Sequence, residues 1–255
     1  MIFVISMAKS IVSKLTRLSA TRMGFDLVPR TSSHNDEKTQ RILEQVKPYT
    51  MTSTERILAL CDAVDYITAR GLEGDIVECG VWKGGSSMAA ALSLLKHGET
   101  ERLLYLYDTF DGMSVPTEFD REIGSGKAAK ALMNSVPKED PVWAYSPLEE
   151  VRANLARTRY PSEKLNFIQG KVEDTIPGRI PGKIAILRLD TDWYESTRHE
   201  LEHLYPLLVT GGVLIIDDYG HWDGARRAVD EYFSRPDRAA LLARIDYTGR
   251  MTLKV

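Results

Sequence analysis

The sequence predicts an α/β fold, with a mainly parallel sheet and helices on both faces, and two observations indicate it. Short apolar strands alternate with helical segments between residues 54 and 233, and strands that alternate with helices form parallel sheets covered on both faces. Most of these strands end in an acidic residue or lead directly into polar residues. Because ligands of such sheets bind at the carboxyl ends of the strands, we expect a functional site at that edge.

The expected elements follow one another from residue 54 onward. Apolar residues recur at helical spacing from Ile57 to Ile67, and Arg70 and Gly71 supply a basic last turn and a C-cap glycine. Further helices are expected at residues 86–96, 149–157, 196–208 and 224–233. Strands are expected at residues 75–79, 103–107, 165–168, 184–189 and 212–216, with two final strands at residues 241–255.

The composition excludes several classes of protein. The chain has 255 residues, is 43% hydrophobic and 27% charged, and has a formal net charge of -3. This profile argues against disorder, collagen and coiled coil, and the lack of a broad basic field argues against binding to nucleic acid. No run of 18 apolar residues predicts a membrane span. Cys61 and Cys79 lie in apolar contexts, which favours a reducing, cytoplasmic location.

Two segments stand apart from the alternating pattern. Residues 1–48 show no strong period, so we expect an N-terminal helical arm followed by one domain over residues 49–255. Residues 109–164 are long, polar and proline-containing, and we expect them to form a lid or an acceptor-binding segment.

A glycine-rich turn, ECGVWKGGSS at residues 78–87, follows the first strand. Glycine lets the backbone turn sharply, and the amides of the next helix then face a ligand. The turn lacks the glycine spacing of dinucleotide-binding and Walker A loops. With an acid at the end of the next strand, it fits S-adenosylmethionine: Asp108 would bind the ribose hydroxyls, and Glu78 would orient the turn or meet the methionine end. The alternative is a glycine-rich turn without a ligand.

Two pairs of aspartates follow consecutive strands. Asp190 and Asp192 come after the strand at residues 184–189, and Asp217 and Asp218 come after the next one. Consecutive strands are usually neighbours, so these acids should converge on one edge of the sheet. Clustered carboxylates repel one another unless they are neutralised, and Mg²⁺ suits such a site. The alternative is that each acid caps a following helix or loop.

Several motifs together resemble the macrocin O-methyltransferase family (TylF/MycF-like). They lie at residues 49–51, 75–86, 107–112, 188–197, 204–206, 211–219, 228–232 and 245–250. The resemblance covers roughly residues 45–255. It implies a Rossmann-like class I methyltransferase fold, with a seven-stranded sheet and an antiparallel last strand. It also implies an S-adenosylmethionine-dependent and Mg²⁺-dependent O-methyltransferase that acts on sugar hydroxyls of natural products. The N-terminal arm, together with this family resemblance, favours a homo-oligomer.

The resemblance implies roles for individual residues. Asp190, Asp217 and Asp218 would bind the metal, and Asp192 would be the general base. The residues that would contact the cofactor are Thr50, Met51, Glu78, Cys79, Gly80, Val81, Gly84, Ser86, Asp108, Thr109, Phe110 and Asp174. The family usually has Gly between the two aspartates of this motif and Met or Leu directly after them. This chain has Thr191 and Trp193 at these two positions.

Aromatic and histidine residues beside the aspartates are candidates for acceptor contact. They are Trp193, Tyr194, His221 and Trp222, and core packing is the alternative for each. Arg188 lies inside an apolar strand and can pair with Glu78 on the neighbouring strand; the alternative is a side chain at the strand end that reaches water.

Two alternative functions remain open. The segment from His199 to His203 matches the H-E-x-x-H signature of zinc proteases. In a helix, however, Leu201 and Leu204 would form the apolar stripe, and the two histidines would lie nearly opposite it, at the surface. The other alternative is a non-catalytic, methyltransferase-like binding protein, which would be expected to have degraded acid motifs.

Overall fold

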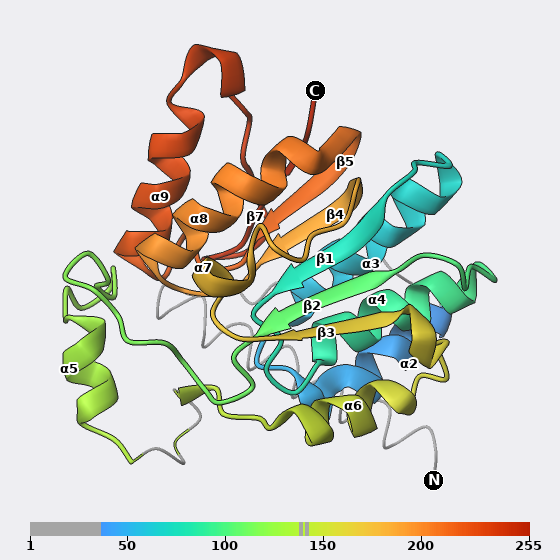
Figure 1. Ribbon diagram of the computed structural model, residues 1–255, viewed down its shortest axis with the longest axis horizontal. Helices are drawn as coiled ribbons and strands as arrows, with labels where there is room; N and C mark the ends of the chain where they lie inside the picture. Colours follow the sequence, from blue (N-terminus) through green and yellow to red (C-terminus); the bar gives the residue numbers. More distant parts are fainter. Residues whose placement is uncertain (1–36, 138–139, 141–142) are drawn as a thin grey trace, which may run out of the picture. The chain divides into compact units, whose positions relative to one another are not determined.

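A seven-stranded sheet forms the centre of the described part of the chain (Figure 1). The structure is a computed structural model that describes residues 37–137, 140 and 143–255. The strand order is β3-β2-β1-β4-β5-β7-β6; β7 pairs antiparallel with both β5 and β6, and the other neighbouring pairs are parallel. The strands are β1 Asp75–Cys79, β2 Leu104–Asp108, β3 Leu165–Gln169, β4 Ile184–Leu189, β5 Leu208–Ile216, β6 Ala243–Arg244 and β7 Arg250–Leu253. The predicted fold class is confirmed.

Helices cover both faces of this sheet. The bounds are α2 Glu37–Val46, α3 Thr54–Ala69, α4 Gly85–Lys96, α5 Ala129–Asn134, α6 Leu148–Ala156, α7 Val172–Thr175, α8 Tyr194–Leu204 and α9 Asp223–Phe233. On one face, α2, α3, α4 and α6 share a hydrophobic cluster with the strands. On the other face, α7, α8 and α9 do the same. The ribbon view shows this layered arrangement (Figure 1).

Successive side chains of each strand point to alternate faces of the sheet, so the same strands contribute to the hydrophobic core on each face. Ile76 of β1 belongs to the cluster with α3 and α4, whereas its neighbour Val77 belongs to the cluster with α8. Successive side chains of a strand point to opposite faces, so a strand buried on both sides needs a continuous apolar run. All six residues of β4, Ile184–Leu189, are accordingly buried at the centre of the sheet.

Local signals explain where α3 begins and ends. The Ser53 hydroxyl accepts a hydrogen bond of 3.1 Å from the Arg56 backbone N–H, which is a typical N-cap interaction. At the other end, Gly71 has a φ of 59° directly after the C-cap residue Arg70. The predicted helix is therefore confirmed, and its capped first turn places Arg56 near the carboxyl edge of the sheet.

The boundary between α8 and β5 differs from the prediction. The helix was expected to continue to residue 208, but α8 ends at Leu204 and β5 already begins at Leu208. Pro206 lies in the short 3-10 turn Tyr205–Leu207 between them, and proline disfavours continuation of an α-helix. Helices α5 and α7, which are six and four residues long, were not predicted.

Helix α2 falls within the predicted N-terminal arm. Its buried residues Thr39, Ile42 and Val46 recur at helical spacing, and the last two belong to the cluster that includes α3 and α4. The first 36 residues of the predicted arm lie outside the described residues. The arm, the boundary at residue 48 and the homo-oligomer stay predictions.

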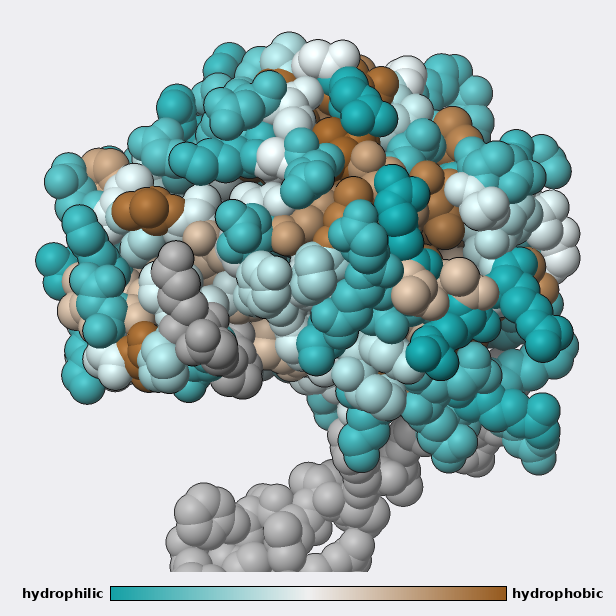
Figure 2. Space-filling model, turned by 60° about the horizontal axis from the view of Figure 1, so that its bottom comes forward, coloured by the Kyte–Doolittle hydropathy of each residue, from teal (hydrophilic) through white to brown (hydrophobic). Residues whose placement is uncertain are grey.

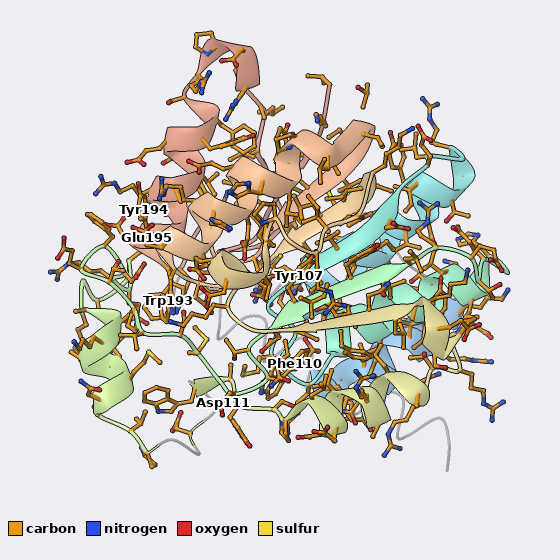
Figure 3. The ribbon with its side chains drawn as sticks, in the orientation of Figure 1. Tyr107, Phe110, Asp111, Trp193, Tyr194 and Glu195 are labelled. Atoms are coloured by element: carbon orange, nitrogen blue, oxygen red, sulfur yellow. The ribbon has the colours of Figure 1, made fainter. Side chains whose placement is uncertain are left out.

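The segment between β2 and α6 packs against the starts of α8 and α9. Asp120 is fully buried and accepts hydrogen bonds from the backbone N–H of Thr117, at 2.6 Å, and of Tyr194, at 2.8 Å. The indole N–H of Trp193 donates to the Ser114 carbonyl at 3.0 Å. Figure 3 shows Trp193 and Tyr194 beside the loop that leads into α5. The predicted lid segment is thus anchored on one side, and its role stays a prediction.

The surface agrees with the balanced composition. Figure 2 shows a largely hydrophilic face with a smaller group of apolar residues near its middle. None of the helices in the described part of the chain combines the length and the apolar character that crossing a membrane requires.

Candidate active site

A cavity of about 210 Å³ lies at the carboxyl ends of β1, β4 and β5. Strand β4 lies between the other two. Beyond its last residue, the N–H of Asp190 donates to the Cys79 carbonyl of β1 at 2.8 Å, and the N–H of Asp217 donates to the Leu189 carbonyl of β4 at 2.9 Å. These bonds extend the sheet by one residue, and so they place both acids at the edge where the glycine turn lies.

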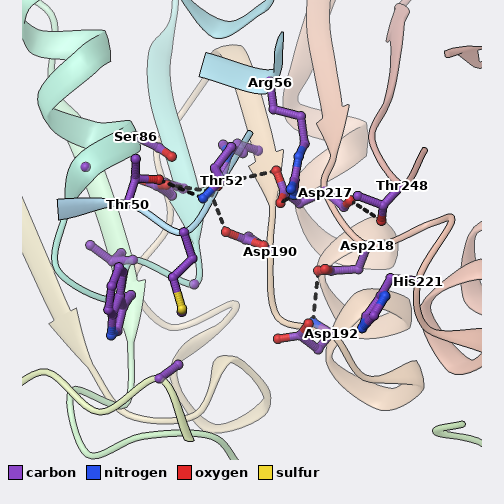
Figure 4. Close-up of a pocket in the computed structure, with 18 of the residues that line it drawn as sticks. Thr50, Thr52, Arg56, Ser86, Asp190, Asp192, Asp217, Asp218, His221 and Thr248 are labelled. Carbon is purple, nitrogen blue, oxygen red and sulfur yellow. Dashed lines mark hydrogen bonds and ion pairs between the residues drawn. The ribbon is translucent and has the colours of Figure 1, made fainter. Parts of the chain in front are cut away.

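Three carboxylates come close enough to share one cation. One oxygen from each of Asp190, Asp217 and Asp218 lies within 4.8 Å of the others, and Asp192 lines the same cavity. Figure 4 shows the four aspartates on adjoining loops, with Arg56 and Thr248 beside Asp217. The structure therefore brings the four predicted aspartates together, whereas their roles stay predictions.

Arg188 is the central cation of the site. Its guanidinium is 3% exposed and forms ion pairs with Glu78 at 2.7 Å, Asp190 at 2.8 Å and Asp217 at 2.7 Å. The predicted pairing with Glu78 is confirmed, and the two residues are direct partners in the register of β1 and β4. Although burial alone would lower the pKa of Arg188, these carboxylates raise it well above its usual value.

A second arginine, Arg56, was not predicted to belong to the site. It pairs with Asp217 and, at 3.0 Å through its Nε, with Asp246 in the turn between β6 and β7. Asp246 also accepts a hydrogen bond of 2.7 Å from the Ser53 hydroxyl. Since 161 and 190 positions separate Arg56 from these two acids, no local pattern could have revealed the pairs.

The cavity carries more negative than positive side chains. Among the described residues, its wall includes five carboxylates and two guanidiniums, namely Glu78, Asp190, Asp192, Asp217, Asp218, Arg56 and Arg188. When all are ionised, the negative charges on this wall exceed the positive ones by three, and neither Asp192 nor Asp218 pairs with either arginine. Burial accordingly raises the pKa of Asp190 and of Asp218 well above its usual value, and the neighbouring acids add to this effect. A divalent cation with oxygen ligands fits this donor set.

Asp192 differs from the other three aspartates in its surroundings. Its backbone has a φ of 65°, in the left-handed region that few side chains adopt. Its Oδ1 accepts a hydrogen bond of 2.7 Å from the indole N–H of Trp222, and its own N–H donates to Asp218 Oδ2 at 3.3 Å. Burial, followed by the charge of Asp190, raises the pKa of Asp192 to about 7. Such a carboxylate can accept a proton near neutral pH.

The glycine turn after β1 closes the opposite side of the cavity. Gly80 has a φ of 84°, and a side chain there would clash with the Asp190 backbone carbonyl. A Cβ on Gly85 would come within 2.5 Å of the Tyr49 carbonyl. Glycine therefore allows residues 49–52 and the end of β4 to approach the turn closely.

Asp108 holds this turn together. Its carboxylate accepts hydrogen bonds from the backbone N–H groups of Val81 at 2.7 Å, Trp82 at 3.0 Å and Phe110 at 2.7 Å. Burial nevertheless raises its pKa above the usual value. Asp108 also lines a second cavity, beside the first, between the ends of β2, β3 and β4. Its predicted contact with ribose stays a prediction.

The structure places most of the predicted cofactor residues at these two cavities. The first wall includes Thr50, Met51, Glu78, Gly80, Val81 and Ser86, and the second includes Gly80, Asp108 and Thr109. The other four predicted cofactor residues belong to the described part of the chain but line neither cavity. Cys79 lies in the core beside α8, Gly84 precedes α4 against Leu155, Phe110 packs on Phe167, and Asp174 is exposed on α7.

Only one of the four predicted acceptor residues, His221, lines the larger cavity. Within the described residues, Trp193, Tyr194 and Trp222 are absent from both walls. The two indoles are buried against each other, with ring centroids 5.0 Å apart. The Tyr194 hydroxyl donates to Glu231 at 2.7 Å. The contacts of these three aromatic residues in the structure are therefore with neighbouring residues of the protein, and their predicted contact with the acceptor stays a prediction.

The H-E-x-x-H segment does not assemble a zinc site in the described residues. Glu200 is fully buried and accepts a hydrogen bond of 2.9 Å from the Thr191 hydroxyl. The His199 ring donates to the Ile176 carbonyl at 2.9 Å and lies against His203. The group of possible metal ligands found in the described chain consists of aspartates alone.

Comparison with known proteins places this site in context. The model of the family described as Macrocin-O-methyltransferase (TylF) matches residues 11–253. The 8-demethyl-8-(2,3-dimethoxy-alpha-L-rhamnosyl)-tetracenomycin-C 4'-O-methyltransferase of Streptomyces olivaceus is 39% identical over 201 residues, which cover 79% of this chain and 74% of that protein. The demethyldecarbamoylnovobiocin O-methyltransferase of Streptomyces niveus is 35% identical, with the same coverage. The solved structure of the O-methyltransferase NovP is similar with a TM-score of 0.71 and 32% identity, over 81% of this chain and 82% of that chain.

Proposed function

The chain belongs to the macrocin O-methyltransferase family and is an S-adenosylmethionine-dependent O-methyltransferase, and from this premise we propose that it methylates a sugar hydroxyl of a glycosylated natural product. The names of the relatives support this acceptor class, because they give a rhamnosyl tetracenomycin and demethyldecarbamoylnovobiocin as substrates. The observation that carries the proposal is a single cavity in which four aspartates face a glycine turn. The same family membership argues against the non-catalytic alternative.

We propose that the methyl donor lies across the two adjoining cavities. Gly80 lines both of them, so one elongated ligand can pass from one to the other along the end of β1. Residues Thr50, Met51, Val81 and Ser86 would contact its amino-acid end, and Asp108 would contact its ribose. The backbone amides at the start of α4 would favour the negative carboxylate of the donor.

We propose that Asp190, Asp217 and Asp218 hold Mg²⁺. The excess of carboxylates over guanidiniums in this buried cavity supports the assignment, because clustered acids need a cation to remain ionised. When bound, such an ion would lower the pKa of an acceptor hydroxyl and orient it.

Asp192 would act as the general base. It would take the hydroxyl proton of the acceptor, while Trp222 holds its other oxygen. The acceptor oxygen then forms a bond to the methyl carbon as the bond from that carbon to the donor sulfur breaks. Most of the rate enhancement would come from holding both reactants in line within the cavity.

A direct assay tests this proposal. The unmodified chain would be incubated with S-adenosylmethionine, Mg²⁺ and 8-demethyl-8-(2,3-dimethoxy-α-L-rhamnosyl)-tetracenomycin C, or with demethyldecarbamoylnovobiocin, each beside its sugar-free aglycone. We expect one methyl group on the glycosylated compound and none on the aglycone, and at least about a hundredfold lower kcat for Asp192→Asn. Transfer to the aglycones alone would overturn the acceptor class. Full activity of D192N would overturn the assignment of the base.

A further inference from the structure

The indole N–H of Trp222 is directed at the proposed base. It donates a hydrogen bond of 2.7 Å to Asp192 Oδ1. Trp222 is only 7% exposed, and within the described chain it lines neither cavity. An indole nitrogen can donate but not accept, so the interaction has one direction only. Trp222 therefore contacts the proposed base while lying outside the walls of both cavities.

The indole is fixed by its surroundings. Its ring makes edge contacts with Trp193 and His221, with ring centroids 5.0 Å and 4.8 Å away. The backbone N–H of Trp222 donates to the Asp218 carbonyl at 3.1 Å, and the residue forms an isolated antiparallel bridge with Glu122. As the N-cap residue of α9, it is also attached to a helix that packs on α8. The position of the N–H is thus set by packing rather than by the ligand.

The carboxylate of Asp192 needs such a support. It extends from a residue with left-handed backbone geometry, in a loop between β4 and α8. Its backbone N–H reaches Asp218, but at 3.3 Å, which is long for a hydrogen bond of this kind. The side chain of Asp192 also interacts with that of Asp218 in the wall of the same cavity, and under the proposed function Oδ2, the oxygen that the indole does not hold, would accept the proton of the acceptor.

We propose that Trp222 is a positioning residue that fixes the orientation of the Asp192 carboxylate through its indole N–H. The proposal rests on the proposed function, in which Asp192 is the general base. It concerns the orientation of one side chain, so the loss of the N–H should slow the chemical step and leave the binding of both reactants nearly unchanged.

The chain offers a matched control for this test. Trp193 is buried in the same aromatic pair and also donates one N–H, but its acceptor is the backbone carbonyl of Ser114. Replacing either residue, as Trp222→Phe or Trp193→Phe, removes one N–H and shrinks the same cluster. Because phenylalanine is smaller than tryptophan, Trp222 would also be replaced by benzothienylalanine, which keeps the ring shape and lacks the N–H.

The experiment measures kcat, KM and the affinity for S-adenosylhomocysteine, with the rhamnosyl tetracenomycin as acceptor. For W222F and for the benzothienyl variant, we expect kcat to fall about 10- to 100-fold, while KM and the affinity stay within about twofold. For W193F, which loses an edge contact with the indole but no hydrogen bond to Asp192, we expect a smaller fall in kcat than for W222F. The double variant W222F/D192N should be no slower than D192N, because an interaction that acts through Asp192 is already lost there.

Each result has a distinct meaning. A benzothienyl variant with the kcat of the unmodified chain would overturn the proposal. So would a kcat of W222F/D192N that falls below that of D192N by the same factor that W222F alone loses. Equal losses in W222F and W193F would indicate packing alone and would also overturn it. Full activity of D192N, in contrast, would overturn the proposed base itself, so the two failures can be told apart.

Discussion

Arg188 and Asp217 form a buried ion pair of 2.7 Å between the neighbouring strands β4 and β5. The two side chains are 3% and 2% exposed, and the same guanidinium binds Glu78 on β1 and Asp190 at the end of β4. One cation thus connects the carboxyl ends of three adjacent strands. The acidic site and the stability of the sheet therefore depend on the same residue.

The first prediction concerns this arginine. Replacement of Arg188 by methionine keeps most of the apolar stem but leaves three carboxylates without their shared cation. Breaking a buried ion pair on one side typically costs about 3–5 kcal/mol. We expect a loss of this size in the free energy of unfolding, measured by urea denaturation at pH 7.

The control for this prediction is Arg198→Met on α8. Arg198 also pairs with two acids, Glu195 and Glu202, but its side chain is 46% exposed. Exposed pairs contribute little, so the change should stay within about 1 kcal/mol. Equal effects of R188M and R198M would show that the buried network does not stabilise the fold.

The second prediction concerns the proposed metal. Without a divalent ion, Asp190, Asp217 and Asp218 repel one another in a buried cavity, so Mg²⁺ should stabilise the chain. A ligand present at about 100 times its Kd adds about 2.7 kcal/mol to the free energy of unfolding. For a chain of this size, we expect Tm to rise by about 5 °C when Mg²⁺ replaces EDTA, as measured by calorimetry.

The increase in Tm should disappear in Asp218→Asn. Asp237→Asn is the control, because it removes the same formal charge from the short turn Pro236–Arg238, where the side chain is 62% exposed. D237N should retain the full shift. A Tm of the unmodified chain that does not respond to Mg²⁺ would count against a metal at these aspartates.

The convergence of the aspartates was predictable because it follows from strand ends. Asp190 and Asp217 directly follow strongly apolar runs, and the ends of neighbouring parallel strands lie at one edge of a sheet. The pairing of Arg188 with Glu78 was predictable for a similar reason, since a charge inside a buried strand needs a partner on the next strand. Both predictions use only the order and the register of strands.

Other features depend on contacts that no local pattern encodes. Arg56 reaches Asp217 across 161 positions, and Trp222 reaches Asp192 across 30. Such pairs depend on how α3 and α9 pack on the sheet rather than on the spacing of residues within either helix. Asp108 was identified as important, but its three hydrogen bonds to backbone amides show a structural role that its position at a strand end could not distinguish from ligand binding.

The third prediction tests the glycine turn. A Cβ on Gly85 would lie 2.5 Å from the Tyr49 carbonyl and 2.6 Å from Thr50 Cβ, so Gly85→Ala must displace the segment that contains Thr50. If that segment binds the donor, the affinity for S-adenosylhomocysteine should fall about tenfold or more, which corresponds to about 1.4 kcal/mol. Isothermal titration calorimetry measures this change.

Gly182→Ala serves as the control for the glycine turn. Gly182 precedes β4 at the opposite edge of the sheet, and a Cβ there would meet nothing within 4 Å among the described residues. We expect its affinity for S-adenosylhomocysteine to equal that of the unmodified chain. If G85A binds as tightly as G182A, the donor does not depend on residues 49–52.

The fourth prediction concerns Glu200, a fully buried acid in α8. Its Oε1 accepts a hydrogen bond from Thr191, between the two aspartates that follow β4, and its Oε2 has no hydrogen-bond partner among the described residues. Burial raises the pKa of Glu200 well above its usual value. In the unfolded chain this carboxyl ionises near pH 4.3, whereas in the folded chain it keeps its proton to higher pH. Above pH 4.3, the unfolded state therefore binds fewer protons, and the folded state loses stability as the pH rises.

Glu200→Gln should remove this pH-dependent loss, because glutamine is neutral and has nearly the same shape. The free energy of unfolding of E200Q, relative to the unmodified chain, should increase with pH from about 4.3 until the folded pKa is passed, by at most roughly 1.4 kcal/mol per pH unit. Urea denaturation at pH 5, 6 and 7 measures this difference. Glu202→Gln, an exposed position on the same helix, should show no such trend. A constant difference between E200Q and the unmodified chain at all three pH values would mean that Glu200 is ionised in the folded state, with a cation or water that neutralises it.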